Sequence, residues 1–191
     1  MALEHAILVS LSEKPSTGYD LARRFDASIG YFWTATHQQI YRVLAAMEDS
    51  GWVTSTLVPQ PSRPDKKVYE PTAAGRAELA EWLGRPAEPE RPRSDLAVKI
   101  RGVSDGDPAE VRREVARHRM LHAERLDVYL ATEKRDFPQP TALEGRRLHQ
   151  WLVLQGGIAR ERSMLGWCDL VLAALDSGSS GQRPDEGGAR A

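Results

Sequence analysis

The 191-residue sequence is poor in several features that mark common classes of protein. Its one cysteine excludes an intrachain disulfide and favours a reducing compartment. No apolar segment approaches the roughly 20 residues that span a bilayer. The first residues also lack the charged and apolar leader of a secreted protein. We therefore expect a cytoplasmic protein with no membrane partner.

Net charge and catalytic motifs are also scarce. The formal net charge is -1, and residues 19–67 contain six basic and five acidic side chains. Any attraction to nucleic acid must therefore come from where the charges are placed. The sequence has no nucleophile elbow, no phosphate-binding glycine loop and no set of metal ligands. We expect a soluble globular protein that is not an enzyme and that has no cofactor and no metal.

Residues 34–53 are the most informative stretch. Thr36 and Gln39 stand in capping-box spacing, which predicts the start of a helix. Gly51 is suited to end that helix, and Val53 begins an extended segment. Helical spacing predicts one buried stripe, formed by Ile40, Val43, Leu44 and Met47.

The opposite face of this helix is polar and contains His37, Gln38, Tyr41 and Arg42. Glutamine can form two hydrogen bonds with adenine, and arginine can do so with guanine, in the major groove of DNA. A helix with this face could enter that groove. An ordinary solvated helix would have a similar surface, so this pattern alone leaves both interpretations open.

The order of elements in the first half favours a winged helix-turn-helix. Apolar spacing and turn residues predict three helices, a hairpin around a proline-rich loop, and a fourth helix. An aromatic run at residues 31–33 should form a packed corner before the third helix. The first two helices are expected at 2–12 and 18–27, and the third runs from an N-cap at Thr34 or Thr36 to the stop at Gly51. The strands are expected at 53–58 and 67–70, and the last helix at 73–83.

The second half reads as helical. Prolines at 86, 89 and 92 predict an extended linker, and helices are expected at 94–101, 107–134 and 141–176. The last has an apolar seam with spacings of three and four, which requires a partner helix. The predicted fold is mainly α with a small β-hairpin. Its expected parts are a winged helix-turn-helix domain at 1–83, a linker at 84–93, a helical dimerisation and effector domain at 94–176, and a disordered tail at 177–191.

Three separated motifs resemble the PadR family of bacterial transcriptional regulators. They are Gly18-Tyr19-Asp20-Leu21, the run from Phe32-Trp33 through His37-Gln38-Gln39-Ile40-Tyr41-Arg42 to Met47-Glu48 and Gly51, and Val68-Tyr69-Glu70-Pro71-Thr72-Ala73-Ala74-Gly75-Arg76. The resemblance covers about residues 3 to 83. The rest is similar in outline to the longer PadR subgroup, which has a helical C-terminal domain.

The resemblance implies a homodimeric repressor that binds double-stranded DNA. The third helix would enter the major groove, and the wing would touch the backbone or the minor groove. Some family members respond to phenolic or other small aromatic compounds, so such an effector is possible. The DNA-binding candidates are Tyr19, His37, Gln38, Gln39, Tyr41, Arg42, Arg63, Lys66 and Lys67.

Alternative roles stay open at several of these positions. The capping box would draw the side chain of Gln39 back to the helix start, and both tyrosines could serve only in packing. If Arg42, Lys66 and Lys67 each neutralise a phosphate in both subunits, log affinity should fall with log salt at a slope of roughly −5.

The C-terminal half supplies the remaining candidates. We expect dimerisation to involve Leu3, Ile7, Trp151, Leu154, Ile158, Leu165, Cys168, Leu172 and Leu175. Tyr129, Trp151 and Trp167 could line an effector pocket, although plain packing is the simpler interpretation. His118 and His122 share a helical face, and we expect buried or interfacial histidines there rather than a metal site.

A second function fits the near-neutral charge of the first half. The chain could keep the winged-helix shape and act as an adaptor that binds protein instead of DNA. Salt dependence separates the two, because only DNA binding should weaken steeply as salt rises.

Overall fold

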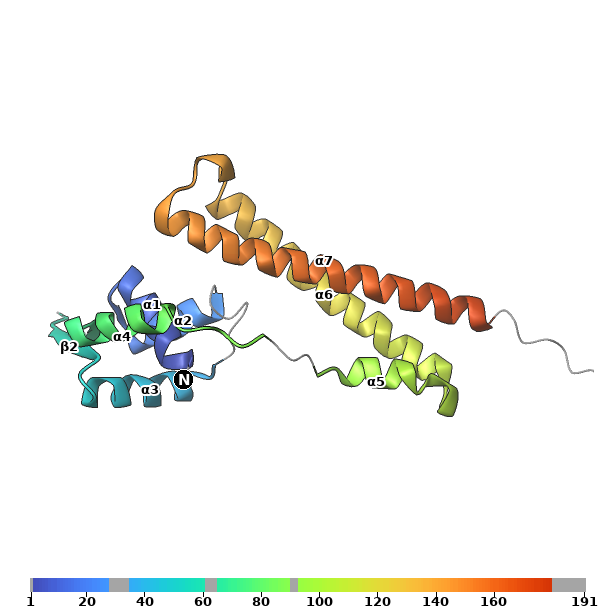
Figure 1. Ribbon diagram of the computed structural model, residues 1–191, viewed down its shortest axis with the longest axis horizontal. Coiled ribbons are helices and arrows are strands. Elements are labelled where there is room, and N and C mark those ends of the chain that lie inside the picture. Colours follow the sequence, from blue (N-terminus) through green and yellow to red (C-terminus); the bar gives the residue numbers. More distant parts are fainter. Residues whose placement is uncertain (1, 28–34, 61–64, 90–92, 180–191) are drawn as a thin grey trace, which may run out of the picture. The chain divides into compact units, whose positions relative to one another are not determined.

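The computed structural model describes residues 2–27, 35–60, 65–89 and 93–179 (Figure 1). The chain divides into two compact units, Met1–Pro89 and Glu90–Ala191. Helices dominate, and the strands form one small antiparallel sheet in the first unit, so the predicted fold class is confirmed. Within the described residues, no helix combines the length and the apolar character that crossing a membrane requires.

Apart from one additional short strand, the first unit follows the predicted order of elements. The predicted aromatic corner at 31–33 lies outside the described residues. Its elements are α1 (Ala2–Glu13), β1 (Ser16–Thr17), α2 (Gly18–Ala27), α3 (His37–Asp49), β2 (Val53–Val58), β3 (Lys66–Pro71) and α4 (Ala73–Leu83).

Strand β1 was not predicted from the sequence, because two residues are too few to show an alternating pattern. It pairs with β3, which becomes the central strand in the order β1-β3-β2. Next along the chain, Thr17 Oγ1 accepts a hydrogen bond from Asp20 N at 3.0 Å, and so caps the start of α2.

Both ends of α3 agree with the sequence signals. The Thr36 hydroxyl accepts from Gln39 N, and the Gln39 side chain accepts from Thr36 N, which completes the predicted capping box. After the helix, Gly51 has φ +74°, a left-handed conformation that costs glycine little. These two signals fix where the polar face of α3 begins and ends.

The core of the first unit lies among α1, α2, α3 and β2. Burial of this apolar surface is the main force that holds α3 in place. The residues of the core are Ile7, Leu8, Leu11, Leu21, Ala22, Phe25, Ile40, Leu44, Met47 and Val53.

The second unit contains two long helices and a short one. They are α5 (Asp95–Arg101), α6 (Pro108–Asp136) and α7 (Gly145–Ser179), with single 3-10 turns, η2 and η3, at Val103–Asp105 and Pro140–Ala142. The predicted start of the last helix at Thr141 was wrong, because that segment forms the 3-10 turn. Residues 177–179 also belong to α7 rather than to a tail, and residues 180–191 lie outside the described part.

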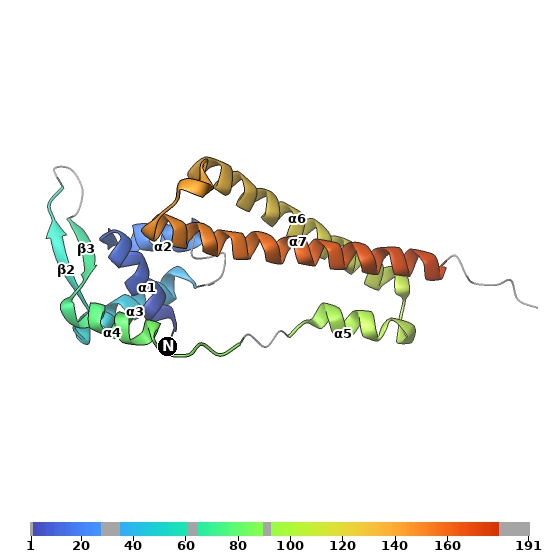
Figure 2. The ribbon, with the colours of Figure 1, turned by 45° about the horizontal axis from the view of Figure 1, so that its top comes forward.

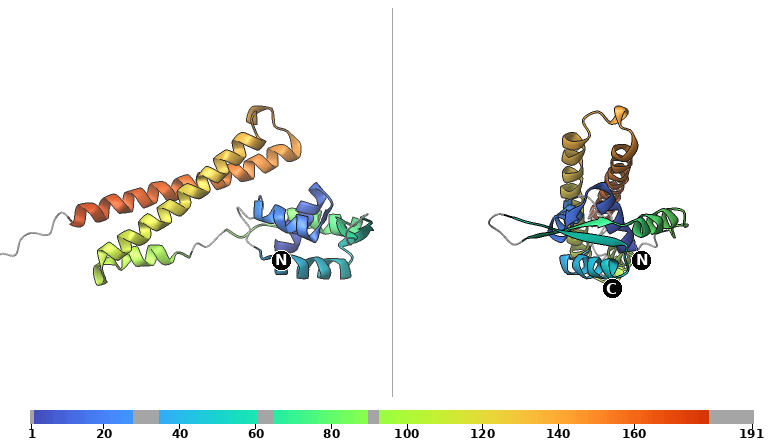
Figure 3. Two further views of the ribbon diagram at one scale, coloured as in Figure 1. Left: turned by 180° about the vertical axis from the view of Figure 1, so that it is seen from behind. Right: turned by 90° about the vertical axis from the view of Figure 1, so that its left-hand side faces the viewer.

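Helices α6 and α7 pack along their lengths (Figures 2 and 3). Their polar pairs are Arg112 with Asp176, Arg119 with Asp169, His122 and Arg125 with Glu161, and Glu133 with Gln155 and Trp151. As the residue number rises in α6 it falls in α7 by a similar amount, which shows that the two helices are antiparallel. The four groups of contacts fix one register between them.

The apolar seam predicted in the last helix is divided between two environments. Leu154, Ile158 and Cys168 are buried within the unit, whereas Trp151, Leu165, Leu172 and Leu175 are half-buried. The partner helix that the seam requires is therefore α6 of the same chain. This corrects the expectation that a second subunit covers the whole seam.

A second seam lies on the outer face of α7 and was not recognised in the sequence. Its residues recur at alternating spacings of four and three, and all of them are exposed. Most are small, with a leucine towards each end, and none is charged. This outer seam consists of Leu152, Gly156, Ala159, Ser163, Gly166, Leu170 and Ala173.

Candidate functional site

The polar face of α3 is accessible. His37, Gln38, Gln39, Tyr41 and Arg42 are all exposed, while the predicted stripe on the other side of the helix is buried or half-buried. The helix is therefore held from behind by the core and presents donors, acceptors and one cation outward. This arrangement suits either contact with a polar polymer or simple solvation.

The two glutamines on this face differ in freedom. The Gln39 side-chain oxygen accepts from Thr36 N at 2.9 Å, so its amide is held at the helix start. The side chain of Gln38 is exposed and has no hydrogen-bond partner among the described residues. Arg42 lies one turn further along and also has no ion-pair partner within that part of the chain. Gln38 and Arg42 are thus the side chains most available for an external partner.

The start of α2 lies against the same surface. A Cβ atom added at Gly18 would lie 2.4 Å from the Tyr41 ring, so the ring would have to shift for any residue with a side chain at this position. Tyr19 and Tyr41 expose 58% and 48% of their surface. The Arg23 guanidinium lies 6.0 Å from the centroid of the Tyr19 ring. The predicted candidates on α2 and α3 therefore share one exposed surface.

The two lysines of the wing have different surroundings, although they are adjacent. Lys66 is exposed and has no ion-pair partner among the described residues. Lys67 Nζ lies 2.7 Å from Glu48 Oε2 on α3 and 5.1 Å from the centroid of the Tyr69 ring. The structure thus ties the ammonium of Lys67 to α3, where the sequence suggested a free cation. Arg63 lies outside the described residues.

Hydrogen bonds around Glu48 shift the ionisation of both partners. The bond from Lys67, followed by the bond from Ser55 Oγ at 2.5 Å, lowers the pKa of Glu48 below its usual value. The bond to Glu48 raises the pKa of Lys67. Both groups are therefore charged over the whole neutral range, which keeps the ion pair intact there.

The predicted histidines of α6 lie beside carboxylates. His122 and Arg125 contact Glu161, which is 3% exposed. His118 Nε2 lies 3.4 Å from Glu114 Oε1. Within the described residues no group of three potential ligands could hold a metal ion. Sequence spacing could not reveal Glu161, because it comes from α7.

The three candidates for an effector pocket do not meet. Tyr129 is buried against Gly157, whose added Cβ would lie 3.0 Å from the ring. Trp151 donates from Nε1 to Glu133 Oε1 at 3.1 Å. Trp167 follows Trp151 by 16 residues on the same helix, which places it about 24 Å further along the axis. One small molecule cannot contact both tryptophans.

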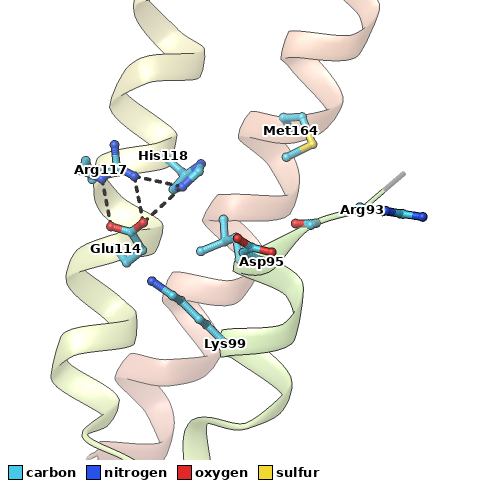
Figure 4. Close-up of a pocket in the computed structure, with 9 residues that line it drawn as sticks. Arg93, Asp95, Lys99, Glu114, Arg117, His118 and Met164 are labelled. Atoms are coloured by element: carbon cyan, nitrogen blue, oxygen red, sulfur yellow. Dashed lines mark hydrogen bonds and ion pairs between the residues drawn. The ribbon is translucent and has the colours of Figure 1, made fainter. Parts of the chain in front are cut away.

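A pocket of ≈ 440 Å³ lies between α5, α6 and α7, and the sequence gave no signal for it (Figure 4). Glu114 and Arg117 form two hydrogen bonds on one side of it, at 2.9 and 2.8 Å. This contact lowers the pKa of Glu114 to about 2. The lining is charged and mixed in sign, and consists of Arg93, Ser94, Asp95, Leu96, Lys99, Glu114, Arg117, His118 and Met164.

Two of the dimerisation candidates lie in the first unit. Ile7 is fully buried in the core, and Leu3 is half-buried against it. Together with Leu154, Ile158 and Cys168, Ile7 is already covered by its own chain. These four side chains are therefore unavailable to a second subunit in this fold, whereas the half-buried candidates Leu3, Trp151, Leu165, Leu172 and Leu175 stay predictions.

Comparison with known proteins shows which families and relatives this chain is similar to. Residues 7–81 match the model described as the transcriptional regulator PadR-like family, and residues 92–176 match the model described as virulence activator alpha C-term. The chain is 54% identical over 185 residues to the probable transcriptional regulator Rv1176c of Mycobacterium tuberculosis, covering 92% of this chain and 98% of that one.

Two further relatives have solved structures. PadR of Bacillus subtilis, a negative transcriptional regulator, is 29% identical and covers 91% of this chain and 97% of its own. Its complex with operator DNA has a TM-score of 0.81 at 26% identity, and the match covers 92% of this chain and 100% of that one. Its complex with p-coumaric acid has a TM-score of 0.74, covering 91% and 95%. The Vibrio cholerae virulence activator AphA has a TM-score of 0.79 at 32% identity, covering 92% and 99%.

Proposed function

The chain belongs to the PadR-like family of transcriptional regulators, and from this premise we propose that it binds DNA as a homodimer and represses transcription. The observation that carries the proposal is the face of α3 on which Gln38 and Arg42 are exposed and unpartnered within the described residues. Gln38 can read adenine, and Arg42 can read guanine or bind phosphate. Tyr19 and Lys66 would add contacts to the backbone on either side.

The repressor role is supported by PadR of Bacillus subtilis. The Bacillus subtilis relative is a negative transcriptional regulator, and its structure with operator DNA resembles this chain over 92% of its length. A repressor needs only to occupy its site, for which an exposed reading helix and a wing are sufficient.

We place the dimer contact on the outer seam of α7. Its seven positions are exposed, uncharged and spaced like the core of a coiled coil. Small residues let two helices approach closely, and the leucines towards the ends supply apolar area. A second copy of α7 has the same pattern, so the seam is self-complementary, as a twofold interface requires.

We further propose that a small aromatic or phenolic compound releases the operator. The support is the Bacillus subtilis relative, for which a complex with p-coumaric acid has been solved. Such a compound would act by binding the conformation that fits DNA less well. Titrating phenolic acids, including p-coumaric acid, while following operator release tests this step, and a flat response across the panel would contradict it.

Selection of bound duplexes from a random-sequence pool tests the main proposal, followed by footprinting of the DNA upstream of the protein's own gene. We expect a roughly palindromic site with half-sites about one helical turn apart, or a multiple of it. A chain that enriches no sequence would contradict the proposal.

The near-neutral charge of the first half is the observation that favours the adaptor function. Lys67 is neutralised by Glu48, so Arg42 and Lys66 are the unpaired cations of α3 and the wing among the described residues. Two subunits then supply four phosphate contacts, and log affinity should fall with log salt at a slope of about −4. An adaptor would bind duplex weakly, with no preferred sequence.

A further inference from the structure

Glu48 connects the two elements proposed to contact DNA. It lies in the last turn of α3, and its carboxylate reaches both strands of the wing. Oε1 accepts from Ser55 Oγ on β2 at 2.5 Å, and Oε2 accepts from Lys67 Nζ on β3 at 2.7 Å. One side chain therefore joins the reading helix to both strands of the hairpin.

The position of Lys67 on β3 explains why only one of the two wing lysines takes part. Successive residues of a strand point to opposite faces, so Lys66 and Lys67 face different sides. Lys67 is paired with Leu57 of β2, two residues beyond Ser55, and its face of the hairpin points to α3. Its ammonium is further held over the ring of Tyr69.

We propose that Glu48 is a positioning residue for DNA recognition: it anchors the wing to the end of α3 and keeps the Lys67 ammonium away from phosphate. This inference rests on the proposed function. It changes which lysine supplies charge to the complex, because Lys66 binds phosphate while Lys67 maintains the angle between the wing and α3. Sequence preference depends on that angle, since Gln38 reads a base only when the wing holds α3 in register.

The adjacent lysines provide a matched pair of variants. The probe is the duplex enriched by selection, compared with a random duplex of equal length, over a series of salt concentrations. Lys66→Met should reduce the slope of log affinity against log salt by about two, because each contact contributes about 0.9 and there are two subunits. Lys67→Met should leave the slope unchanged and reduce the preference for the enriched duplex roughly fivefold.

Removal of the carboxylate charge should have the opposite effect on the slope. In Glu48→Gln the ammonium of Lys67 is free to reach phosphate, so the slope should become steeper by about two. Adding Lys67→Met to this variant should return the slope to the wild-type value. A role of Glu48 in stability alone would not change the slope, and circular dichroism confirms that each variant is folded.

The possible outcomes separate this inference from the function on which it rests. A wild-type chain that binds no duplex overturns the proposed function, and the inference falls with it. If the wild-type chain binds duplex and Lys67→Met reduces the slope of log affinity against log salt as much as Lys66→Met does, the inference is overturned and the proposed function is not. An unchanged slope in folded Glu48→Gln also overturns it, and if that variant does not fold, Lys67→Met decides.

Discussion

His122 Nδ1 lies 2.5 Å from Glu161 Oε2, although 39 positions separate the two residues in the chain. Arg125 Nη1 approaches the other oxygen of the same carboxylate at 3.2 Å. Glu161 is thus a buried anion with two partners from α6, in the middle of a largely apolar helix interface. Burial of such a charge is costly unless it is paired, so the three residues depend on one another.

Glu161→Ala should therefore destabilise the second unit. It removes the carboxylate and leaves the largely buried His122 without this partner, while the half-exposed Arg125 can turn to solvent. We expect a loss of roughly 2–4 kcal/mol in the free energy of unfolding, measured by urea denaturation. Glu124→Ala on the exposed side of α6 is the control and should change stability by less than about 0.5 kcal/mol. Equal effects in both variants would show that Glu161 is not a structural anchor.

Replacing the two adjacent glutamines of α3 one at a time should distinguish base recognition from helix capping. Gln38→Ala should relax preference at one base pair of each half-site, at a cost of about 1–3 kcal/mol, with little change in folding. Gln39→Ala should instead destabilise the fold by about 1 kcal/mol, because its side chain closes the capping box. Affinity for single-base operator variants and thermal unfolding are the measurements. Loss of base preference in Gln39→Ala alone would contradict this division.

The outer seam of α7 should determine the oligomeric state. Ala159→Glu places a charge at the middle of the seam, and since that side chain is exposed in the single chain, the fold should persist. We expect a monomer in sedimentation equilibrium and a large loss of operator affinity, because two half-sites are no longer bound together. Ala109→Glu, at another exposed alanine, is the control. A dimeric Ala159→Glu variant would place the contact elsewhere.

Glu114 should contribute to the acid stability of the second unit. Its pKa is lowered to about 2 by the hydrogen bonds from Arg117, from an ordinary value of 4.5. Since the folded pKa is depressed, the stabilisation is complete above 4.5 and is lost as pH falls towards 2. Glu114→Gln should therefore melt below the wild type at pH 7 and match it near pH 2. Parallel melting curves across this range would contradict the assignment.

Local signals in the sequence predicted most of the first unit. Thr36, Gln39 and Gly51 act on neighbouring residues, so the limits of α3 can be read from adjacent positions. Strand β1 could not, because two residues become a strand only through pairing with β3. The amphipathic spacing of α3 likewise predicts which of its faces is exposed.

Contacts between distant residues account for what the sequence did not show. Lys67 looked like a free cation, because its partner Glu48 lies 19 positions earlier and on another element. In α7 the apolar seam is evident from the sequence and the outer seam is not, since small residues such as Gly156 and Ala159 give little hydropathy signal. The pocket beside Glu114 is formed by three separate helices, so no single stretch of sequence encodes it.

The fixed register between α6 and α7 limits how the second unit can move. Arg112, Arg119, His122 and Glu133 each contact a different level of α7. A slide of one turn, about 5.4 Å, would break all four levels at once. Sliding of α7 along α6 is therefore unfavourable. Rotation or tilting of α6 and α7 together as one rigid body is the motion that preserves these contacts.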